Sequence, residues 1–413
     1  MIHFLIAFTG ALLFIYALLI FYYHWIWDRI PGPVPTYPGE TFITEKNLSG
    51  GITFKPSTET GDDLTDDPVH DISFMPVGLR VSVIIPARNE VKRIGPCLDA
   101  LMNQNYPGEL TEIIVVNDFS TDETATLVQQ HPLKSTVLNL ADHVKDGLNS
   151  YKKKAIETGI LQSSGELIIC TDADCTMGPN WIRRIVETYQ RNKFQFIAAP
   201  VKIIPGRSWL AVFQTLDFIS LQGITGAAVF RNLYPMCNGA NLAYSKTAFE
   251  AVNGFSDIDQ IASGDDMMLM KKIQEKYPGK TGYLKDEQAI VNTAPAENIS
   301  SFLNQRIRWA SKIRHYKHPS TFVTLALVYT VNAGLLILFF CCFLSGTWRW
   351  LLILLAFKTV SEYFFVSKVA GFFGQRSLMK YFPFFQPVHI LYTVIAGGFG
   401  SFGKYEWKNR KVR

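Results

Sequence analysis

The stretch that decides the fold is Ile168-Ile169-Cys170-Thr171-Asp172-Ala173-Asp174, an apolar run of strand type that ends in two carboxylates one residue apart. A buried strand that stops at acidic residues brings them to the carboxyl edge of a sheet, where open α/β sheets bind ligands. Side chains of an extended chain alternate sides, so Asp172 and Asp174 can face one crevice. Two such carboxylates repel each other unless one is protonated or a cation lies between them, and oxygen ligands suit Mg²⁺ or Mn²⁺. The alternative for a lone pair of this kind is a capped loop with solvated aspartates.

The surrounding pattern extends this strand into a sheet. Further apolar strand-type runs occur at 81–85, 113–116, 137–140 and 196–199. Helix-type patterns lie between them: one runs through Leu98 and Leu101, one opens at a capping box from Ser120 to Glu123, one covers 153–161, and one begins near Pro179. Strands alternating with helices predict a mostly parallel, doubly wound α/β sheet.

Both ends of the 413-residue chain are apolar, in contrast to the middle. Residues 2–27 carry no Lys, Arg, Asp or Glu, and this segment is about long enough to cross a bilayer. No signal-peptide cleavage site follows it. We therefore predict a transmembrane anchor over 1–27. Residues 28–79 are rich in Pro and Gly, and we predict a linker here. A second metal site at their acidic cluster (Asp62, Asp63, Asp66, Asp67) is the disfavoured alternative.

The C-terminal region, 319–413, contains three apolar segments at 322–345, 349–370 and 382–402. The second contains Lys358 and Glu362, and charges inside a span usually face protein or a polar cavity. The third is broken by prolines and glycines and precedes a basic tail (Lys404, Lys408, Arg410, Lys411, Arg413). The positive-inside rule keeps such a basic tail in the cytosol. If all three segments crossed the membrane, the tail would lie on the side opposite the catalytic domain. We therefore expect the last segment to be re-entrant or interfacial.

Composition excludes some classes of function. The net charge of +5 is mild and spread along the chain, so nucleic acid is not an expected partner. The six cysteines form no C-x-x-C pair, which fits a reduced, cytosolic compartment for the main domain. Cys170 and Cys175 flank the acidic pair and are interpreted as packing residues.

Three later stretches add polar groups to this domain. An apolar helix pattern over 207–236, either a core helix or one lying on the membrane, precedes the turn Gly239-Ala240-Asn241-Leu242. Gly264-Asp265-Asp266 opens a helix, where carboxylates also serve simply to complement the helix dipole. A helix near 299–315 carries Gln305, Arg308 and Trp309, which share a face because they lie at i, i+3 and i+4.

Taken in order, these motifs resemble the membrane-bound family 2 glycosyltransferases with a GT-A fold. The resemblance covers about 80–315, within a predicted GT-A domain over 80–318. It rests on V-I-I-P-A-R-N-E at 83–90, V-N-D-F-S-T-D at 116–122, Lys152 to Ala155, and the D-A-D of Asp172 to Asp174. It continues through G-A-N-L at 239–242, G-D-D at 264–266 and the Q-x-x-R-W signature of polysaccharide synthases and ceramide-glucosyltransferase-like enzymes at 305–309.

The resemblance implies a role for each matched residue. Donor binding would fall to Pro86, Ala87, Glu90, Asp118, Lys152, Asp172, Gln305 and Arg308. Asp174 would ligate Mg²⁺ or Mn²⁺ on the diphosphate, and Trp309 would line the acceptor site. Asp266 matches the catalytic base; Asp265 stands where the family has Glu, so both carboxylates remain catalytic candidates.

The implied function is an inverting glycosyltransferase that uses a nucleotide-sugar donor, with a UDP-sugar expected, and a membrane-lipid or glycan acceptor. A processive polysaccharide synthase that exports its product is the alternative within this class, although three C-terminal segments are few for a channel. A non-catalytic nucleotide-sugar-binding membrane protein is the alternative of another class, and a transporter is disfavoured by the long polar middle. We expect a protein of the plasma or inner membrane with its catalytic domain in the cytoplasm.

Overall fold

The computed structural model describes residues 2–33, 42–46, 52–56, 78–144, 150–261, 264–311, 319–400, 405–407 and 410–412. The short strands β1 (Phe42–Lys46) and β2 (Ile52–Pro56) form one antiparallel pair, and β13 (Tyr405–Trp407) and β14 (Arg410–Val412) form another. The acidic cluster of the predicted linker lies outside the described residues, as do Lys404, Lys408 and Arg413 of the basic tail.

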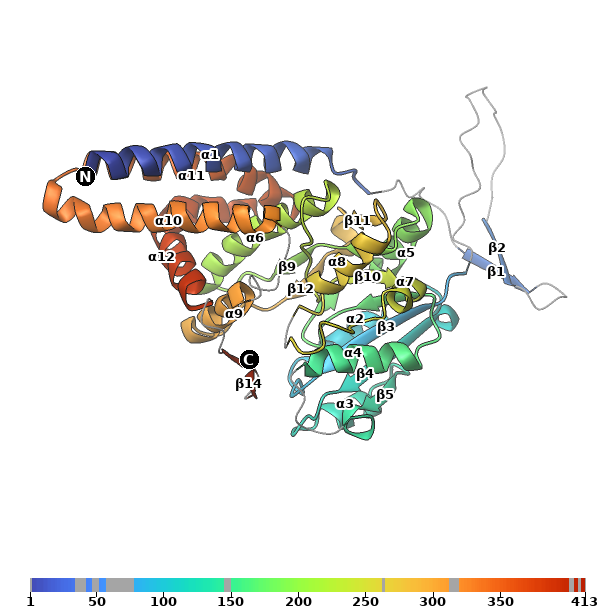
Figure 1. The fold of residues 1–413 in the computed structure, drawn as a ribbon. Coiled ribbons are helices and arrows are strands. Elements are labelled where there is room, and N and C mark those ends of the chain that lie inside the picture. The colour runs from blue at the N-terminus through green and yellow to red at the C-terminus, as the bar shows by residue number, and fades with distance from the viewer. Residues whose placement is uncertain are drawn as a thin grey trace, which may run out of the picture.

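The centre of the α/β domain is a seven-stranded sheet of order β11-β8-β10-β6-β3-β4-β5 (Figure 1). Its strands are β3 (Val81–Ala87), β4 (Thr111–Asn117), β5 (Thr136–Asn139), β6 (Leu167–Cys170), β8 (Phe196–Ala198), β10 (Leu242–Ser245) and β11 (Thr281–Tyr283). All neighbours are parallel except β10, which runs antiparallel to both β6 and β8. The predicted mostly parallel α/β sheet is therefore confirmed.

Helices cover both faces of this sheet. They are α2 (Ile94–Met102), α3 (Thr124–Gln130), α4 (Tyr151–Gln162), α5 (Trp181–Asn192), α7 (Lys246–Ala251) and α8 (Met267–Lys276). Alternate strand residues enter different cores: Ile84 packs with Ile156 of α4, whereas Val83 and Ile85 pack with Leu98 of α2. Burial on both faces explains why the strands are continuous apolar runs.

A smaller sheet lies beside the main one and joins distant parts of the domain. It has the order β7-β12-β9, with β7 (Thr176–Met177), β12 (Val291–Thr293) and β9 (Val201–Ile203). Because β7 follows the Asp172 to Asp174 segment directly, this sheet fixes the far end of that segment.

The start of α3 differs from the prediction. The capping box was expected at Ser120, but the helix begins at Thr124, and the Asp122 carboxylate accepts from the Thr124 N–H at 3.1 Å. Ser120 instead accepts from the backbone N–H of Asn89 at 3.1 Å. The Ser120 hydroxyl is used to join two loops, and the N-cap residue Glu123 makes no side-chain capping hydrogen bond.

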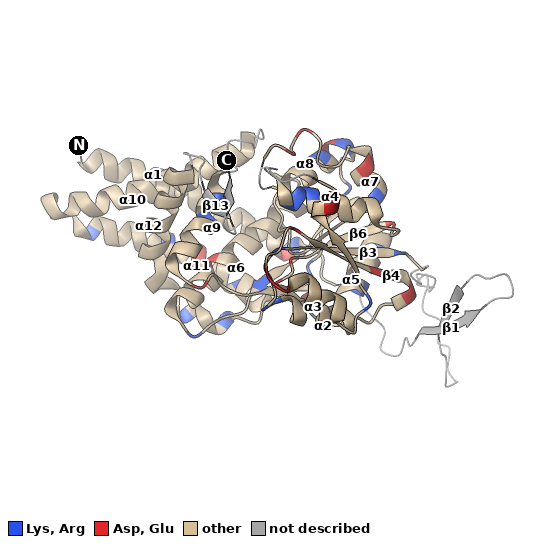
Figure 2. Cartoon of the chain, turned by 90° about the horizontal axis from the view of Figure 1, so that it is seen from below, with Lys and Arg blue, Asp and Glu red and all other residues tan. Residues whose placement is uncertain are grey.

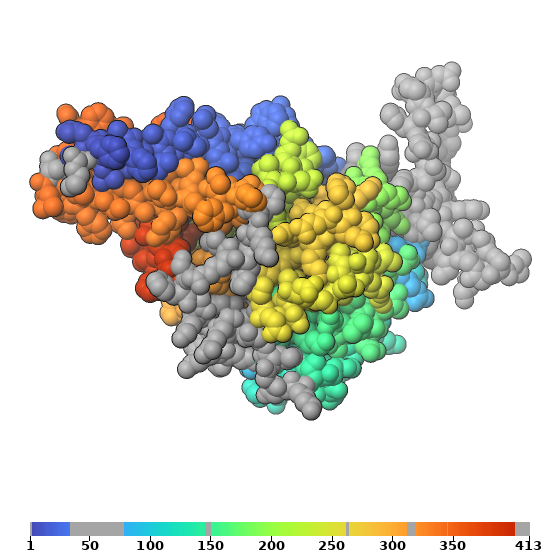
Figure 3. All heavy atoms as spheres, viewed as in Figure 1, coloured from blue at the N-terminus to red at the C-terminus, as the bar shows by residue number. Residues whose placement is uncertain are grey.

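Three helices in the described part are long and apolar enough to cross a membrane: α1 (Ile2–Arg29), α10 (Pro319–Ser345) and α11 (Trp348–Phe372). They extend from one end of the α/β domain, and α1 and α10 lie side by side there (Figures 1 and 3). These helices contain few charged residues, whereas most of the acidic and basic residues lie in the α/β domain (Figure 2). Many of their outward side chains are apolar and exposed, among them Phe14 and Leu18.

Helix α6 (Trp209–Phe230) decides between the two interpretations of 207–236. Its buried residues occur all round the helix, and it packs between the sheet and the helices α1 and α11. A Cβ on Gly223 would lie 2.6 Å from Val369, and one on Gly226 would lie 2.7 Å from Trp27, so both glycines permit close helix contacts. α6 is therefore a core helix, as expected for a helix that is apolar on every side.

The remaining helices close the assembly near the domain boundary. α9 (Ile299–Ser311) and α12 (Phe382–Gly400) pack against each other, and the 3-10 turn η5 (Arg376–Tyr381) leads from α11 into α12. α12 contains Pro387 and is not one of the three span-like helices in the described residues. That the last segment is re-entrant or interfacial stays a prediction.

Candidate active site

The parallel strands bring the predicted donor-site residues to one edge. Register pairs Ala87 of β3 with Asn117 of β4, and Ile84 of β3 with Cys170 at the end of β6. The loop after each strand therefore leaves the sheet at its carboxyl edge. Pro86 and Ala87 lie at the end of β3, and Asp118 and Asp172 follow β4 and β6.

The loops after β3 and β4 are tied together. The N–H of Asp118 donates to the carbonyl of Ala87 at 2.8 Å, and the Arg88 guanidinium donates to the carbonyls of Asp118 and Phe119, each at 2.9 Å. The backbone N–H of Glu90 donates to the Thr124 hydroxyl at 2.8 Å. The structure thus holds Ala87, Glu90 and Asp118 in one small, largely buried region.

Lys152 joins two of the predicted carboxylates. Its ammonium lies 2.8 Å from the Asp172 carboxylate and 3.3 Å from that of Asp265. Burial alone would lower the pKa of Lys152, but these two carboxylates outweigh it and hold the pKa above its ordinary value. Lys152 is thus a protonated link between the strand that ends at Asp172 and the segment that opens α8.

The second carboxylate of the D-A-D segment has different neighbours. The Asp174 carboxylate lies 3.9 Å from the Arg93 guanidinium and accepts a weak hydrogen bond from the Cys175 thiol at 3.7 Å. Nearby Cys97 is buried, and burial with the charges of Asp174 and Asp172 raises its pKa to about 12. The cysteines around this segment are therefore neutral packing groups, in agreement with the interpretation of Cys175 from the sequence.

The donor set at Asp174 can be compared with what a divalent ion requires. No three His, Cys, Asp or Glu side chains of the described chain gather into a metal cluster. An ion at Asp174 would therefore complete its shell with water and phosphate oxygens, which is the usual manner of Mg²⁺ beside a nucleotide. The residues present fit an ion of this kind, with Asp174 as its protein ligand.

The two neighbouring carboxylates Asp265 and Asp266 point to different partners. Asp265 pairs with Lys152, whereas Asp266 caps α8: one carboxylate oxygen accepts from the Met267 N–H at 2.7 Å and the other from the Gly239 N–H at 3.3 Å. A Cβ at Gly239 would lie 3.1 Å from the Lys152 nitrogen and 3.2 Å from Asp265. The absence of a side chain at 239 therefore allows this close arrangement.

The reversed strand β10 explains how Gly239 reaches the site. Leu242, the first residue of β10, pairs with Cys170 of β6 and Ala198 of β8, so the preceding turn lies at the same edge as Asp172. Asn241 anchors this turn: its amide donates to the carbonyls of Pro200 and Ala289, and its oxygen accepts from the Trp181 indole. Asn241 is therefore a structural residue of the G-A-N-L motif.

The helix α9 presents Trp309 together with a residue that the sequence did not single out, Arg306. The Arg306 guanidinium donates to the Asp217 carboxylate of α6 at 2.6 and 3.1 Å, and lies 4.3 Å from the Trp309 ring. Gln305 accepts from Arg306 within the helix, and Arg308 is partly exposed. Arg306 is thus the buried arginine of α9. That Gln305, Arg308 and Trp309 act together on one face, with Gln305 and Arg308 at the donor, stays a prediction.

A cavity of about 410 Å³ extends from this region into the helical bundle. Its walls include Asn238, Asp266 and Met267 on the domain side, Arg306 and Trp309 of α9, and residues of α1, α6, α10, α11 and α12. Most of the lining is apolar, as in Leu216, Leu325, Phe365 and Phe385. Asp266 and Trp309 therefore line the same cavity as residues of α1, α10 and α11, the three helices that are long and apolar enough to cross a membrane.

These features define an α/β domain of the GT-A kind. Residues 82–252 match the family described as Glycosyl transferase family 2, so the chain contains a domain of that family. The chain also superimposes with a TM-score of 0.55 on mannosyltransferase PcManGT from Pyrobaculum calidifontis, determined in complex with GDP-Man and Mn²⁺. That match is 18% identical and covers 93% of this chain and 99% of the other, so it establishes the shared fold.

Two curated relatives each match a little over half of the chain. Glycosyltransferase AglE of Haloferax volcanii is 27% identical over 229 residues, which are 55% of this chain and 71% of AglE. The poly-beta-1,6-N-acetyl-D-glucosamine synthase of Staphylococcus epidermidis is 25% identical over 236 residues, 56% of this chain but only 53% of the synthase. The aligned part of this chain thus spans about half the length of that synthase.

Proposed function

We propose that this protein is a membrane-bound, inverting glycosyltransferase that moves a sugar from a nucleotide-sugar donor, with a UDP-sugar expected, to a membrane lipid. The observation that carries this proposal is the cavity that Asp266 and Trp309 share with α1, α10 and α11. A lipid chain in the apolar part of this cavity would have its polar end beside the carboxyl edge of the sheet.

The donor half of the site would use the residues at that edge. Ala87, Glu90 and Asp118, held together by the loops after β3 and β4, would bind the nucleoside. Lys152 and Asp172 would lie at the diphosphate, and the lysine charge would stabilise the leaving group. The nucleotide sugar bound by the structural neighbour supports this type of donor.

A divalent ion, Mg²⁺ or Mn²⁺, would be held by Asp174 and would supply Lewis-acid stabilisation of the leaving diphosphate. The Mn²⁺ in the structural neighbour supports such an ion here.

On the acceptor side, Asp266 would act as the general base. A hydroxyl oxygen that attacks the anomeric carbon must lose its proton, and a positioned carboxylate contributes about 10²–10⁴-fold to such a step. Asp266 faces the cavity, whereas Asp265 is paired with Lys152, so we assign the base to Asp266. Trp309, fixed by Arg306 and packed near Phe218, would position the acceptor end.

The distribution of cations supports a cytoplasmic catalytic domain. Arg29 ends α1 at the domain side, Lys368 lies near the domain end of α11, and Arg376 and Lys380 follow it. The positive-inside rule places such residues in the cytosol, where nucleotide sugars are available. A cysteine placed at exposed Arg191 should therefore escape impermeant reagents added to intact cells.

A processive synthase remains the second candidate because one relative bears a polysaccharide-synthase name. The test uses purified protein in lipid nanodiscs, an isotope-labelled panel of nucleotide sugars and a membrane lipid extract, with products identified by mass spectrometry. The proposal expects a lipid that gains one sugar of inverted anomeric configuration, with no product from Asp266→Asn. Long glycans would support the synthase, and donor binding without any transfer would support a non-catalytic protein.

A further inference from the structure

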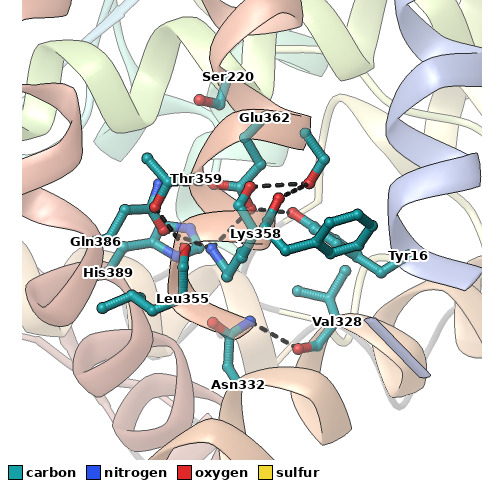
Figure 4. Close-up of polar contacts among 12 residues, drawn as sticks. Tyr16, Ser220, Val328, Asn332, Leu355, Lys358, Thr359, Glu362, Gln386 and His389 are labelled. Atoms are coloured by element: carbon teal, nitrogen blue, oxygen red, sulfur yellow. Dashed lines mark hydrogen bonds and ion pairs between the residues drawn. The ribbon is translucent and has the colours of Figure 1, made fainter. Parts of the chain in front are cut away.

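A buried network of charged and amide groups from α1, α11 and α12 borders the cavity (Figure 4). The Lys358 ammonium donates to the Glu362 carboxylate and to the Gln386 amide oxygen, each at 2.7 Å. The Gln386 amide nitrogen donates to the other oxygen of Glu362 at 2.7 Å, and the Tyr16 hydroxyl donates to Glu362 at 2.5 Å. Lys358 is thus neutralised by Glu362; the Tyr16 hydroxyl shares one carboxylate oxygen with Lys358, and the Gln386 amide satisfies the other.

A second ion pair borders the same cavity. Both the Nε and one terminal nitrogen of Arg306 donate to Asp217, and the other terminal nitrogen donates to Gln305 at 2.9 Å. The Tyr392 hydroxyl donates to the second oxygen of Asp217, and His389 lies 4.0 Å from it. Each of the three guanidinium nitrogens of Arg306 therefore donates to a group of the protein.

The charges that face the cavity are mainly negative. Asp217, Glu362 and Asp266 line it, and Arg306 is the only Lys or Arg in the part of the lining that the structure describes. Lys358 does not reach the cavity surface, since its side chain is fully buried behind Glu362. An anionic group entering this cavity would meet carboxylates and one cation that is already paired, in surroundings where an uncompensated charge is costly.

The cavity walls also contain polar atoms that could bond to a neutral polar group of a ligand. The Thr321 hydroxyl and the Nδ1 atom of His389 are buried with no hydrogen-bond partner among the described residues, and both residues line the cavity. A hydroxyl or amide of a ligand could satisfy such atoms without bringing a charge. These atoms distinguish the cavity from a purely apolar groove.

We propose that the acceptor is an uncharged lipid alcohol and not a lipid phosphate; this inference rests on the proposed function and specifies its substrate class. The lipid hydroxyl oxygen bonds to the anomeric carbon while the bond from that carbon to the diphosphate breaks. The diphosphate takes the bonding electron pair, and the hydroxyl proton passes to Asp266. An alcohol requires this base, whereas a phosphate oxygen is already deprotonated at neutral pH.

The experiment compares acceptors that differ only in the phosphate. Nanodiscs containing the full-length protein receive diacylglycerol or phosphatidic acid with the same acyl chains, and polyprenol or its phosphate of the same length. The panel of labelled nucleotide sugars is then added and each product is quantified. We expect transfer to at least one alcohol to exceed transfer to its phosphate at least tenfold. Preferred transfer to a phosphate would overturn this inference and leave the proposed lipid glycosyltransferase intact, whereas transfer to no lipid would overturn both.

A charge variant tests the physical reason. Glu362→Gln retains the hydrogen-bonding shape but leaves Lys358 without its carboxylate partner, so the ratio of phosphate to alcohol bound should rise at least tenfold. Lys368→Gln is the matched control, because it removes an exposed charge from the same helix, and it should leave the ratio unchanged. An unchanged ratio in a folded Glu362→Gln variant would overturn the electrostatic argument. If that variant does not fold, the comparison of matched lipids in the wild type decides.

Discussion

Replacing Asp266 by Asn separates the proposed catalytic role of this carboxylate from its structural role. Asp266 caps α8 through the 2.7 Å hydrogen bond from the Met267 N–H. Asn keeps an oxygen for this bond, and Asn and Asp are about equally good helix caps. Loss of the negative charge at the helix start costs only about 0.3–1 kcal/mol. The variant should therefore fold, with a small decrease in its free energy of unfolding.

Its effect on catalysis should be much larger. An amide cannot accept the hydroxyl proton, and loss of a general base lowers turnover about 10²–10⁴-fold. That range corresponds to about 2.7–5.4 kcal/mol in the activation free energy. Since this exceeds the expected loss of stability several-fold, a small structural effect cannot account for it.

The assay combines transfer rate, donor affinity by calorimetry and thermal unfolding of the same preparation. Asp266→Asn should bind the donor as the wild type does and unfold at nearly the same temperature, while transfer collapses. Asp265→Asn is the matched comparison: loss of its ion pair with Lys152 should weaken donor binding. A nearly wild-type transfer rate in Asp266→Asn, with an inactive Asp265→Asn that still binds donor, would refute the assignment of the base.

The same domain supports four further predictions. Asp174→Ala should abolish transfer, as should excess EDTA on the wild type; full activity in EDTA would contradict the metal site. Trp309→Ala should retain donor binding and lose about 10²-fold in transfer, because the acceptor end is misplaced; wild-type transfer would place α9 outside the site. The pKa of Lys152 is raised above its ordinary value, so its ion pairs stabilise the fold at every pH below about 10.4 and are lost only as the pH rises further; the stability difference between wild type and Lys152→Met should therefore be equal at pH 7 and pH 9. Because the pKa of buried Cys97 is raised to about 12, its thiol stays neutral at pH 8, and peptide mapping after maleimide treatment of the folded protein should show it unmodified.

The strands and the acidic edge could be predicted because they depend on local patterns. Ile168 to Cys170 are buried in the sheet, and an apolar run of this kind that ends in carboxylates is typical of a central strand whose end faces a ligand site. The direction of β10 could not be predicted, since it depends on the path through β9 and α6. For the same reason the sequence did not reveal that Asn241 is held by backbone carbonyls from two other segments.

The face of α9 shows a second limit. Spacing at i, i+3 and i+4 groups Gln305, Arg308 and Trp309, but it does not say which arginine points inward. Asp217 of α6 decides this, because a buried carboxylate requires a cation and Arg306 is within reach. The one sequence signal for this ion pair is Asp217 itself, because an acidic residue within an apolar helix indicates a buried carboxylate that needs a cation.

The central claim is that the acceptor lipid occupies the cavity between the α/β domain and the helices α1, α10 and α11. A lipid alcohol with a photoreactive group along its chain, cross-linked to the protein in nanodiscs and mapped by mass spectrometry, tests it directly. Labels should fall on cavity-lining residues such as Leu325, Phe385 and Trp309, and excess unlabelled lipid alcohol should remove them. Labels confined to the outward side chains Phe14 and Leu18 of α1, unaffected by competitor, would contradict the account.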